Sequence, residues 1–214
     1  MNEKIAALRR EYTLRGLQKS DLDPDPMWQF ARWFEDALAA QPEDPNAMTL
    51  ATATADGRPS ARIVLLKGFD ADGFLFFTNY SSRKGSELAQ NPRAALNFHW
   101  PAIERQICVT GMVEKVSREI SEQYFQSRPL GSQLGAWAST QSAVVPNRLW
   151  LETRLEEMRA KFSSDKIPLP PAWGGYRLTP ESMEFWQGRP NRLHDRLLYS
   201  WQRDGSWKIE RLSP

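Results

Sequence analysis

The sequence has few of the residues that build disulfides or zinc sites. Its 214 residues include one cysteine, Cys108, and two histidines, His99 and His194. A single cysteine excludes an internal disulfide, and one thiol with two imidazoles cannot complete an ordinary structural zinc site without carboxylates. We therefore expect no metal and a reducing compartment. Because the apolar Ile107 and Val109 flank Cys108, we expect a buried strand thiol rather than a nucleophile.

Signatures of several enzyme classes are also missing. The chain contains no Gly-x-Ser-x-Gly elbow, which leaves hydrolase-type nucleophilic catalysis unsupported. It contains neither the Gly-x-x-x-x-Gly-Lys pattern of a nucleotide-binding loop nor the Gly-x-Gly-x-x-Gly dinucleotide fingerprint. Since no side chain carries electrons, redox chemistry would need a bound cofactor.

Long apolar stretches and a large net charge are absent as well. No predominantly apolar stretch reaches the roughly 18 residues that a membrane span needs, and the N-terminus leads into alternating charge without an apolar signal region. The 28 basic and 26 acidic residues give a formal net charge of +2, which by itself does not favour nucleic acid. We expect a cytoplasmic protein with neither a membrane nor a nucleic-acid partner, in which local basic clusters matter more than total charge.

The first part of the chain predicts an arm followed by a helix. Residues 1–25 are charged and predict an arm, and residues 26–214 predict a single domain. Asp25 suits the N-cap of a helix and Pro26 its first position. Helical spacing then places four apolar side chains on one core-facing side: Phe30, Trp33, Phe34 and Leu38.

Short strands dominate the rest of the chain. Strands are predicted at residues 48–54, 60–67, 74–78, 94–100, 106–116, 175–178, 182–186, 197–202 and 207–212, and further helices at 82–90, 118–126 and 148–162. Residues 128–147 are polar and broken, which predicts a binding loop. Because the strands do not alternate with helices, we expect a β-dominated α+β fold, barrel-like rather than doubly wound.

The densest group of functional side chains lies near the C-terminus. Three arginines and one histidine fall within eight residues: Arg189, Arg192, His194 and Arg196. Cations this close repel one another unless an anion pairs with them, so a negative ligand is expected. In an extended segment Arg192 and His194 would face the same side. The alternative is a solvated turn in which His194 pairs with a neighbouring carboxylate.

Three more segments carry cations that could bind an anion. Arg62 and Lys67 end an apolar strand and would face opposite sides of it unless a bulge intervenes. Arg83 and Lys84 follow two serines at the start of a helix, where a phosphate would fit. Each segment also has an ordinary interpretation, as solvated strand ends and as a helix cap.

The third segment lies near the end of a predicted helix. Tyr124 and Arg128 are four residues apart, and Ser132 follows, a combination of hydroxyls and guanidinium that suits a phosphate. Pairing on the helix surface is the alternative. Gln141 and Ser142 add two neutral donors. Several anion-ready patches in one small domain indicate more than one phosphorylated ligand.

Together these segments resemble the pyridoxine/pyridoxamine 5′-phosphate oxidase family. The similarity runs from about Arg9 to Pro214, and Met183 stands where a branched aliphatic residue is more usual. The hallmark motif of the family resembles Glu184–Gln187 with Arg192–Arg196, and its flavin-binding segments resemble Arg62–Lys67, Arg83–Lys84 and Gln141–Ser142.

The resemblance implies an FMN-binding split β-barrel with flanking helices, present as a homodimer with two FMN molecules at the subunit interface. It implies oxidation of pyridoxine 5′-phosphate and pyridoxamine 5′-phosphate to pyridoxal 5′-phosphate, as in vitamin B6 biosynthesis and salvage. A hydride would pass from the C4′ carbon of the substrate to N5 of FMN, and O2 would reoxidise the flavin and yield H2O2.

The resemblance also implies roles for individual residues. Arg192 and His194 would be catalytic and lie over the pyridine ring opposite the flavin. The cofactor-binding residues would be Arg62, Ile63, Val64, Leu65, Leu66, Lys67, Phe77, Thr78, Arg83, Lys84, Gln106, Gln141 and Ser142, with Trp186 and Arg196 from the partner subunit. The substrate-binding residues would be Lys67, Tyr124, Arg128, Ser132, Arg192, Leu193 and His194, with Arg9 and Tyr12 in the arm. The arm, residues 1–25, would be mobile and close over the site as a lid.

Two other functions stay open on the sequence. One keeps the flavin barrel and changes the reaction, as in a flavin reductase that uses another anion. The other is a non-catalytic nucleic-acid binder that uses the basic patches and the aromatic residues. Two roles are also open for His194, as a base or as a group that positions the substrate.

Overall fold

The computed structural model describes residues 11–14, 16–40, 43–162 and 166–214. The chain divides into two compact units. The first unit comprises Met1–Thr49, Ala95–Gly111 and Pro180–Pro214, and the second unit comprises Leu50–Ala94 and Met112–Thr179. Arg9 of the predicted arm lies outside the described residues, and the predicted boundary at residue 25 stays a prediction.

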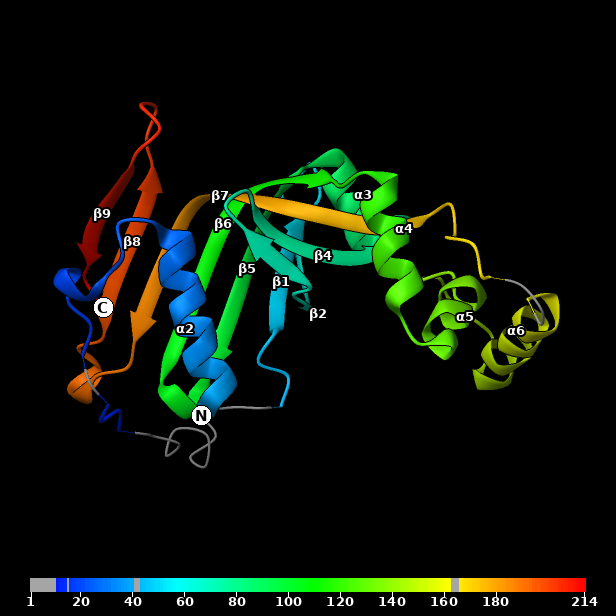
Figure 1. The fold of residues 1–214 in the computed structure, drawn as a ribbon, viewed down its shortest axis with the longest axis horizontal. Helices are drawn as coiled ribbons and strands as arrows, with labels where there is room; N and C mark the ends of the chain where they lie inside the picture. The colour runs from blue at the N-terminus through cyan, green and yellow to red at the C-terminus, as the bar shows by residue number, and fades with distance from the viewer. Residues whose placement is uncertain (1–10, 15, 41–42, 163–165) are drawn as a thin grey trace. The chain divides into compact units, whose positions relative to one another are not determined.

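The described residues contain nine strands in one sheet (Figure 1). The order is β2-β1-β5-β6-β7-β4-β3, with β8 paired to β7 and β9 paired to β8. The bounds are β1 (Ala47–Ala53), β2 (Pro59–Leu65), β3 (Gly68–Asp70), β4 (Gly73–Asn79), β5 (Arg93–Trp100), β6 (Arg105–Lys115), β7 (Trp173–Gln187), β8 (Asp195–Trp201) and β9 (Trp207–Leu212). The β-dominated α+β class predicted from the sequence is confirmed.

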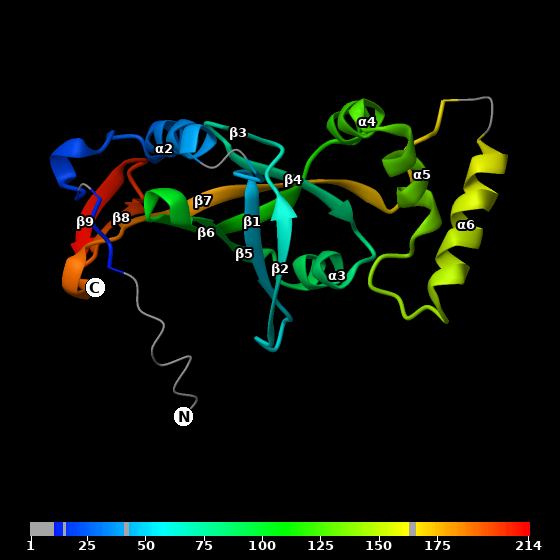
Figure 2. The same ribbon diagram turned by 90° about the horizontal axis from the view of Figure 1, so that it is seen from below.

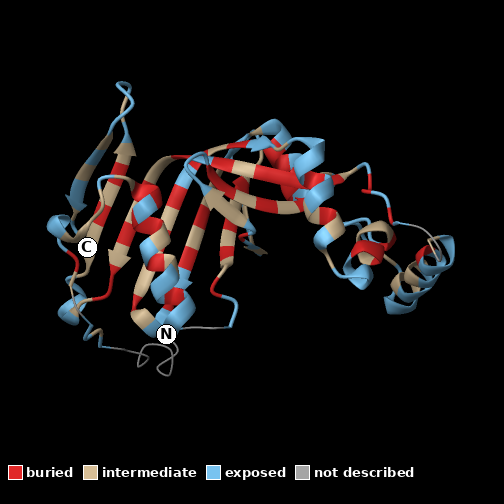
Figure 3. Cartoon of the chain, viewed as in Figure 1, coloured by how far each residue is buried: buried red, intermediate tan, exposed pale blue. Residues whose placement is uncertain are grey.

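Helices flank these strands. They are α2 (Pro26–Ala40), α3 (Arg83–Gln90), α4 (Arg118–Ser127), α5 (Leu130–Ala138) and α6 (Arg148–Lys161), with short 3-10 turns η1 (Lys19–Asp21), η2 (Pro101–Ile103) and η3 (Pro190–Arg192). Burial alternates along the strands, as Figure 3 shows. In β6, Ile107 and Val109 are fully buried while Cys108 between them is only half-buried. The predicted burial of Cys108 was wrong because consecutive strand residues face opposite sides.

In the first unit, α2 lies along the sheet (Figure 1). The predicted cap is present, since Oδ1 of Asp25 accepts a hydrogen bond from the backbone N–H of Met27 over 2.8 Å. Phe30 is fully buried, and its ring packs against that of Phe98 in β5 with centroids 5.1 Å apart. The prediction for Leu38 was wrong, because its side chain is exposed.

Strand β7 replaces two predicted strands. Its first part pairs with β4, with Phe77 opposite Gly175, and its second part pairs with β8, with Trp186 opposite Arg196. Pro180 lies between the two paired regions. A proline has no N–H to donate to a ladder, so it fits where a strand changes partner. The sequence break at Pro180 therefore marks a change of partner and not the end of a strand.

In the second unit, Figure 2 shows α5 between α4 and α6. The interpretation of residues 128–147 as a loop was wrong for its first half, which forms α5. Leu134 and Ala138 on α5 are buried and pack in one apolar cluster with Phe125 and Trp173. The apolar face of α5 is narrow, and its glycines lower the helical propensity. Local pattern therefore missed a helix that tertiary packing stabilises.

Candidate active site

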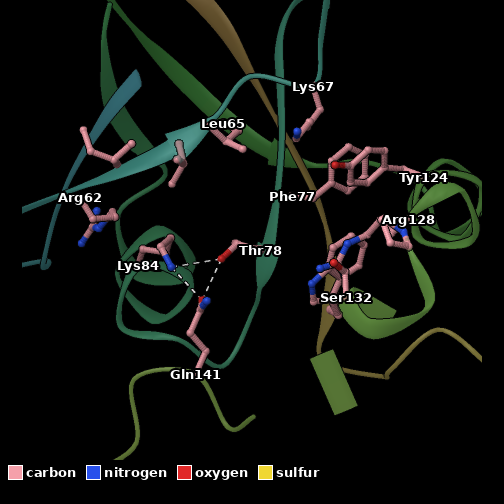
Figure 4. Close-up of a pocket in the computed structure, with 14 residues that line it drawn as sticks. Arg62, Leu65, Lys67, Phe77, Thr78, Lys84, Tyr124, Arg128, Ser132 and Gln141 are labelled. Atoms are coloured by element: carbon pink, nitrogen blue, oxygen red, sulfur yellow. Dashed lines mark hydrogen bonds between the residues drawn. The ribbon is translucent and has the colours of Figure 1, made fainter. Parts of the chain in front are cut away.

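A pocket of about 480 Å³ lies in the second unit (Figure 4). Its lining residues are Arg62, Ile63, Val64, Leu65, Lys67, Phe77, Thr78, Lys84, Tyr124, Arg128, Pro129, Ser132, Gln141 and Trp173. All of these except Pro129 and Trp173 were predicted site residues. Strand β2, strand β4 and helices α3, α4 and α5 thus bring segments that are far apart in the sequence to one cavity.

Both cations of the β2 segment line the pocket. The prediction that Arg62 and Lys67 face opposite sides was wrong, because β2 ends at Leu65 and strict alternation ends with it. Beyond that point the backbone N–H of Lys67 donates to the carbonyl of Leu75 over 2.8 Å. Ile63 is 65% exposed. Leu66, also predicted as a cofactor contact, is buried and does not line the pocket.

Lys84 places its charge among neutral partners. Its Nζ donates to Gln141 Oε1 over 2.8 Å, to Thr78 Oγ1 over 3.1 Å and to Ser82 Oγ over 3.4 Å, and Figure 4 shows the first two contacts. Burial, and secondarily the charge of Arg62, lowers the pKa of Lys84 below its ordinary value. A buried ammonium group with uncharged partners gains most from a nearby anion.

Arg62 is held by Glu87, which is buried on α3. Its Nη2 lies 3.4 Å from Oε2 of Glu87, while its Nη1 donates to Thr52 Oγ1 over 2.6 Å and to the carbonyl of Leu50 over 3.1 Å. Burial lowers the pKa of Arg62, and the charge of Glu87 opposes that effect. The guanidinium therefore has a fixed direction.

Arg83 lies outside the lining of the pocket. Its side chain is exposed, its Nε contacts Oε1 of Glu87 at 2.8 Å, and its backbone N–H donates to Ser142 Oγ over 3.2 Å. The predicted residues Arg83 and Ser142 are therefore neighbours of each other. Sequence reasoning missed Glu87, although its i,i+4 spacing from Arg83 on a helix was an available signal.

Glu87 stays ionised over a wide range of pH. Burial alone would raise its pKa, but hydrogen bonds from Ser60, Thr52 and Arg83 outweigh that effect and lower the pKa to about 2. Ser60 Oγ donates to Oε2 over 2.5 Å, and Thr52 Oγ1 donates to the same oxygen. One negative charge therefore holds the two predicted cofactor-binding arginines.

Arg128 carries an unpaired donor inside the second unit. Its Nη1 is buried and has no hydrogen-bond partner among the described residues. Its guanidinium carbon lies 4.8 Å from the centroid of the Trp173 ring. Trp173 stacks on Phe77, and Phe77 stacks on Tyr124 with ring centroids 4.0 Å apart. Burial lowers the pKa of Arg128. A buried N–H without a partner costs about 1–3 kcal/mol, which a bound anion would relieve.

The predicted catalytic residues lie in the first unit. The extended arrangement expected for Arg192 and His194 was wrong, because Asn191 and Arg192 adopt left-handed backbone conformations with φ of 56° and 60° in η3. His194 is half-buried, and its Nδ1 accepts a hydrogen bond from the backbone N–H of Arg189 over 3.1 Å. Burial, and then the charge of Arg192, lowers the pKa of His194.

Aromatic rings surround His194. The centroid of its ring lies 4.6 Å from that of Trp186 and 5.4 Å from that of Tyr12, and Tyr12 meets Trp186 edge-on at 5.6 Å. Leu193 beside His194 is exposed. We call Tyr12, Trp186 and His194 the aromatic cluster. It joins the predicted arm, a predicted cofactor residue and a predicted catalytic residue.

The remaining predicted residues also belong to the first unit. Nε of Arg196 contacts Oε1 of Glu184 at 2.7 Å, a pair that raises the pKa of Arg196. Gln106 lies in β6 and is half-buried. The structure therefore brings the predicted residues together in two groups, one in each unit.

The described residues contain neither a cluster of metal-ligating side chains nor a helix that could span a membrane. In residues 11–14, 16–40, 43–162 and 166–214, no group of three or more His, Cys, Asp or Glu side chains could hold a metal ion. Within the same ranges, no helix is both long and apolar enough to cross a membrane.

Two family models match the chain. The model described as "Pyridoxamine 5′-phosphate oxidase" matches residues 34–162, and the one described as "Pyridoxine 5′-phosphate oxidase C-terminal dimerisation region" matches residues 173–214. Two relatives named pyridoxine/pyridoxamine 5′-phosphate oxidase are similar over nearly the whole length. The Nostoc sp. protein is 58% identical over 100% of both chains, and the Cupriavidus necator protein is 61% identical over 99% of both.

Solved structures share the fold. The structure of PhzG from Burkholderia lata, in complex with tetrahydrophenazine-1-carboxylic acid, has a TM-score of 0.88 and 31% identity, over 96% of this chain and 100% of that one. A pyridoxamine 5′-phosphate oxidase-related, FMN-binding protein from Nostoc punctiforme has a TM-score of 0.70 and 21% identity, over 90% of this chain and 98% of that one. The predicted split β-barrel is confirmed.

Proposed function

The chain belongs to the pyridoxamine 5′-phosphate oxidase family, and we propose that it oxidises pyridoxine 5′-phosphate and pyridoxamine 5′-phosphate to pyridoxal 5′-phosphate with bound FMN. One observation carries the proposal. The pocket of the second unit holds two buried cationic groups that lack an acidic partner among the described residues, namely Nζ of Lys84 and Nη1 of Arg128. Cofactor and substrate each bring a phosphate, so two such groups match two ligands.

The residues on the Lys84 side fit FMN. Lys84 and Arg62 would hold its phosphate, with Arg83 and Ser142 nearby, because a phosphate replaces the neutral partners of Lys84 with a stronger acceptor. The exposed apolar side chains Ile63 and Leu65 would lie against the flat ring system. The chemistry that FMN would supply when bound is acceptance of a hydride from the C4′ carbon of the substrate, followed by transfer of the electrons to O2 with formation of H2O2.

The residues on the Arg128 side fit the substrate phosphate. Nη1 of Arg128 would donate to one phosphate oxygen, and the hydroxyls of Tyr124 and Ser132 would donate to others. Lys67 is exposed, lines the same pocket and supplies a further positive charge. Because the Trp173 ring supports the guanidinium, the donors are directed before the ligand arrives, which lowers the entropy cost of binding.

The residues of the first unit would complete the pocket of a partner subunit. The family model for residues 173–214 is described as a dimerisation region, which supports a homodimer. In that assembly Trp186 and Arg196 would contact FMN, and Arg192, Leu193 and His194 would contact the substrate, with Tyr12 and Arg9 from the arm. Gln106 would contact the flavin ring. The chemical role of these side chains is to orient the C4′ carbon and to exclude water.

A related oxidation of another acid is the alternative. PhzG, at 31% identity, was solved with tetrahydrophenazine-1-carboxylic acid, whose carboxylate is also an anion. The hydroxyl and guanidinium set of Tyr124, Arg128 and Ser132 offers more donors than a single carboxylate needs and favours a phosphate.

The test combines colour and turnover. The purified protein should be yellow, release FMN on denaturation, and form pyridoxal 5′-phosphate and H2O2 from pyridoxamine 5′-phosphate in air. A matched reaction with unphosphorylated pyridoxamine should be far slower, because the phosphate contacts are missing. A yellow protein that produces no pyridoxal 5′-phosphate would favour another substrate. A colourless protein with steeply salt-dependent binding to RNA would favour nucleic-acid binding.

A further inference from the structure

Glu104 combines burial with a strained backbone. Its side chain is 4% exposed, and its φ of 55° and ψ of 38° place it in the left-handed region at the end of η2. Glycine and asparagine adopt this conformation readily, whereas glutamate seldom does. The backbone conformation at this turn therefore favours a residue other than glutamate. We expect the glutamate side chain to have a role of its own at this position.

The two ends of Glu104 bind two different segments. Oε2 accepts hydrogen bonds from the consecutive backbone N–H groups of Thr13 and Leu14, both over 3.1 Å. The backbone carbonyl of Glu104 accepts a hydrogen bond from the N–H of Gly188 over 2.8 Å and one from Nε2 of Gln187 over 3.2 Å. Glu104 thus joins the segment after Tyr12 to the end of β7.

These two segments meet at the aromatic cluster. A Cβ at Gly188 would lie 2.6 Å from Cδ1 of Tyr12, so the Tyr12 ring packs directly on the backbone there. The same ring lies against Trp186 and His194. The position of Tyr12 therefore depends on how closely its segment is held to Gly188.

We propose that Glu104 is a positioning residue that holds Tyr12 against Trp186 and His194. The kinetic part of this proposal rests on the proposed function, because it treats Tyr12 and His194 as substrate contacts. The carboxylate matters because an ionised acceptor strengthens both backbone hydrogen bonds.

A second set of contacts holds Leu17 independently of Glu104, so the effect of a Glu104 substitution should be confined to residues 12–14. The N–H of Leu17 donates to Oδ2 of Asp195 over 2.9 Å, and its carbonyl accepts from Nη2 of Arg211 over 3.0 Å. These contacts do not involve Glu104. Loss of the Glu104 carboxylate should therefore release residues 12–14 and leave Leu17 in place.

Two substitutions in the full-length protein separate the side chain from the turn. Glu104→Asn suits the left-handed backbone, but its side chain is one methylene shorter and does not reach both N–H groups. Glu104→Gln keeps the reach and loses the charge, so it tests the proposal even if the asparagine variant folds poorly. Asp36→Asn is the matched control, since it removes another carboxylate of the first unit, 2.6 Å from Arg105.

Hydrogen–deuterium exchange of the protein without substrate is the first measurement. We expect exchange at Thr13 and Leu14 to rise about tenfold or more in Glu104→Asn and less in Glu104→Gln, which corresponds to the loss of charge-assisted hydrogen bonds. Exchange at Leu17 and FMN content should stay unchanged, and Asp36→Asn should behave like the parent. Unchanged exchange at Thr13 and Leu14 in both Glu104 variants would overturn the proposal.

Kinetics give the second measurement. We expect KM for pyridoxine 5′-phosphate to rise roughly threefold to tenfold in Glu104→Asn, with a smaller change in kcat. Combined with Tyr12→Ala, the Glu104 substitution should add little, because both act through the same ring. Additive effects would contradict action through Tyr12. The two proposals can fail separately. Faster exchange at Thr13 and Leu14 in the Glu104 variants would still support the role of Glu104 in holding this segment if the parent protein formed no pyridoxal 5′-phosphate. The absence of that product would overturn the proposed function.

Discussion

The backbone N–H of Arg189 donates a hydrogen bond to Nδ1 of His194 over 3.1 Å. Because Nδ1 accepts, the neutral imidazole carries its hydrogen on Nε2 and presents a donor to a ligand. Protonation of Nδ1 would break this hydrogen bond. The hydrogen bond therefore favours the neutral ring. Burial and the charge of Arg192 favour the neutral ring as well, because they lower the pKa of His194.

His194 should therefore position the substrate and not act as an obligatory base. We expect His194→Asn to lower kcat/KM by roughly tenfold while the pH–rate profile keeps both limbs, because one neutral hydrogen bond is lost. Steady-state kinetics from pH 5.5 to about 9 would measure this. A profile that loses a limb in His194→Asn would identify His194 as the base.

Arg192 should act on substrate and turnover without holding the cofactor. Arg192 is exposed at the end of η3 in the first unit, whereas the proposed FMN-phosphate residues Arg62 and Lys84 belong to the second unit. We expect Arg192→Met to lower kcat/KM by roughly tenfold to a hundredfold and to leave the flavin absorbance per protein unchanged. Loss of the yellow colour in this variant would count against the assignment.

Arg128 should lower the free energy of unfolding of the substrate-free protein and strengthen the binding of the substrate. Its buried Nη1 has no partner among the described residues, so Arg128→Met should raise the free energy of unfolding of the substrate-free protein by about 1 kcal/mol. The same variant should lose roughly tenfold or more in kcat/KM with FMN retained. Urea unfolding and steady-state kinetics measure the two effects.

Lys84→Met is the matched comparison for Arg128→Met, because it removes the other buried cationic group of the pocket that lacks an acidic partner among the described residues. Lys84→Met should weaken the binding of FMN more than the binding of the substrate. Fluorescence titration of the protein with FMN would measure this loss of affinity. If Arg128→Met lost FMN and Lys84→Met lost only substrate, the two phosphate assignments would have to be exchanged.

Glu87 should make the stability of the FMN-free protein depend on pH. Its folded-state pKa of about 2 lies below the ordinary 4.5, so its contribution is fully present above pH 4.5 and is lost as the pH falls toward 2. The contribution is on the order of 3 kcal/mol. Urea unfolding at pH 6 and pH 3 should show a smaller difference in Glu87→Gln than in the parent. The exposed Glu122 provides the control, since Glu122→Gln should leave that difference unchanged.

Particular elements show where local pattern was sufficient. The cap at Asp25 and the helix after it follow from neighbouring residues alone, and so does the helix that begins after Ser82. Helix α5 does not follow from neighbouring residues, because its two glycines weaken the helical pattern in the sequence. It is stabilised by tertiary packing, in which Leu134 belongs to one apolar cluster with Trp173. The left-handed turn at Arg192 also escaped prediction, since no glycine marks it.

The sequence by itself determined most elements and the chemical groups of the site, because capping, strand alternation and side-chain charge depend on residues close together in the chain. Only the tertiary structure decided that Arg62 and Lys67 line the same pocket, that Glu87 holds Arg62 and Arg83, and that Glu104 binds the segment after Tyr12. These relationships join residues that are remote in the chain, and their geometry depends on where strands end and change partner, which local spacing does not encode.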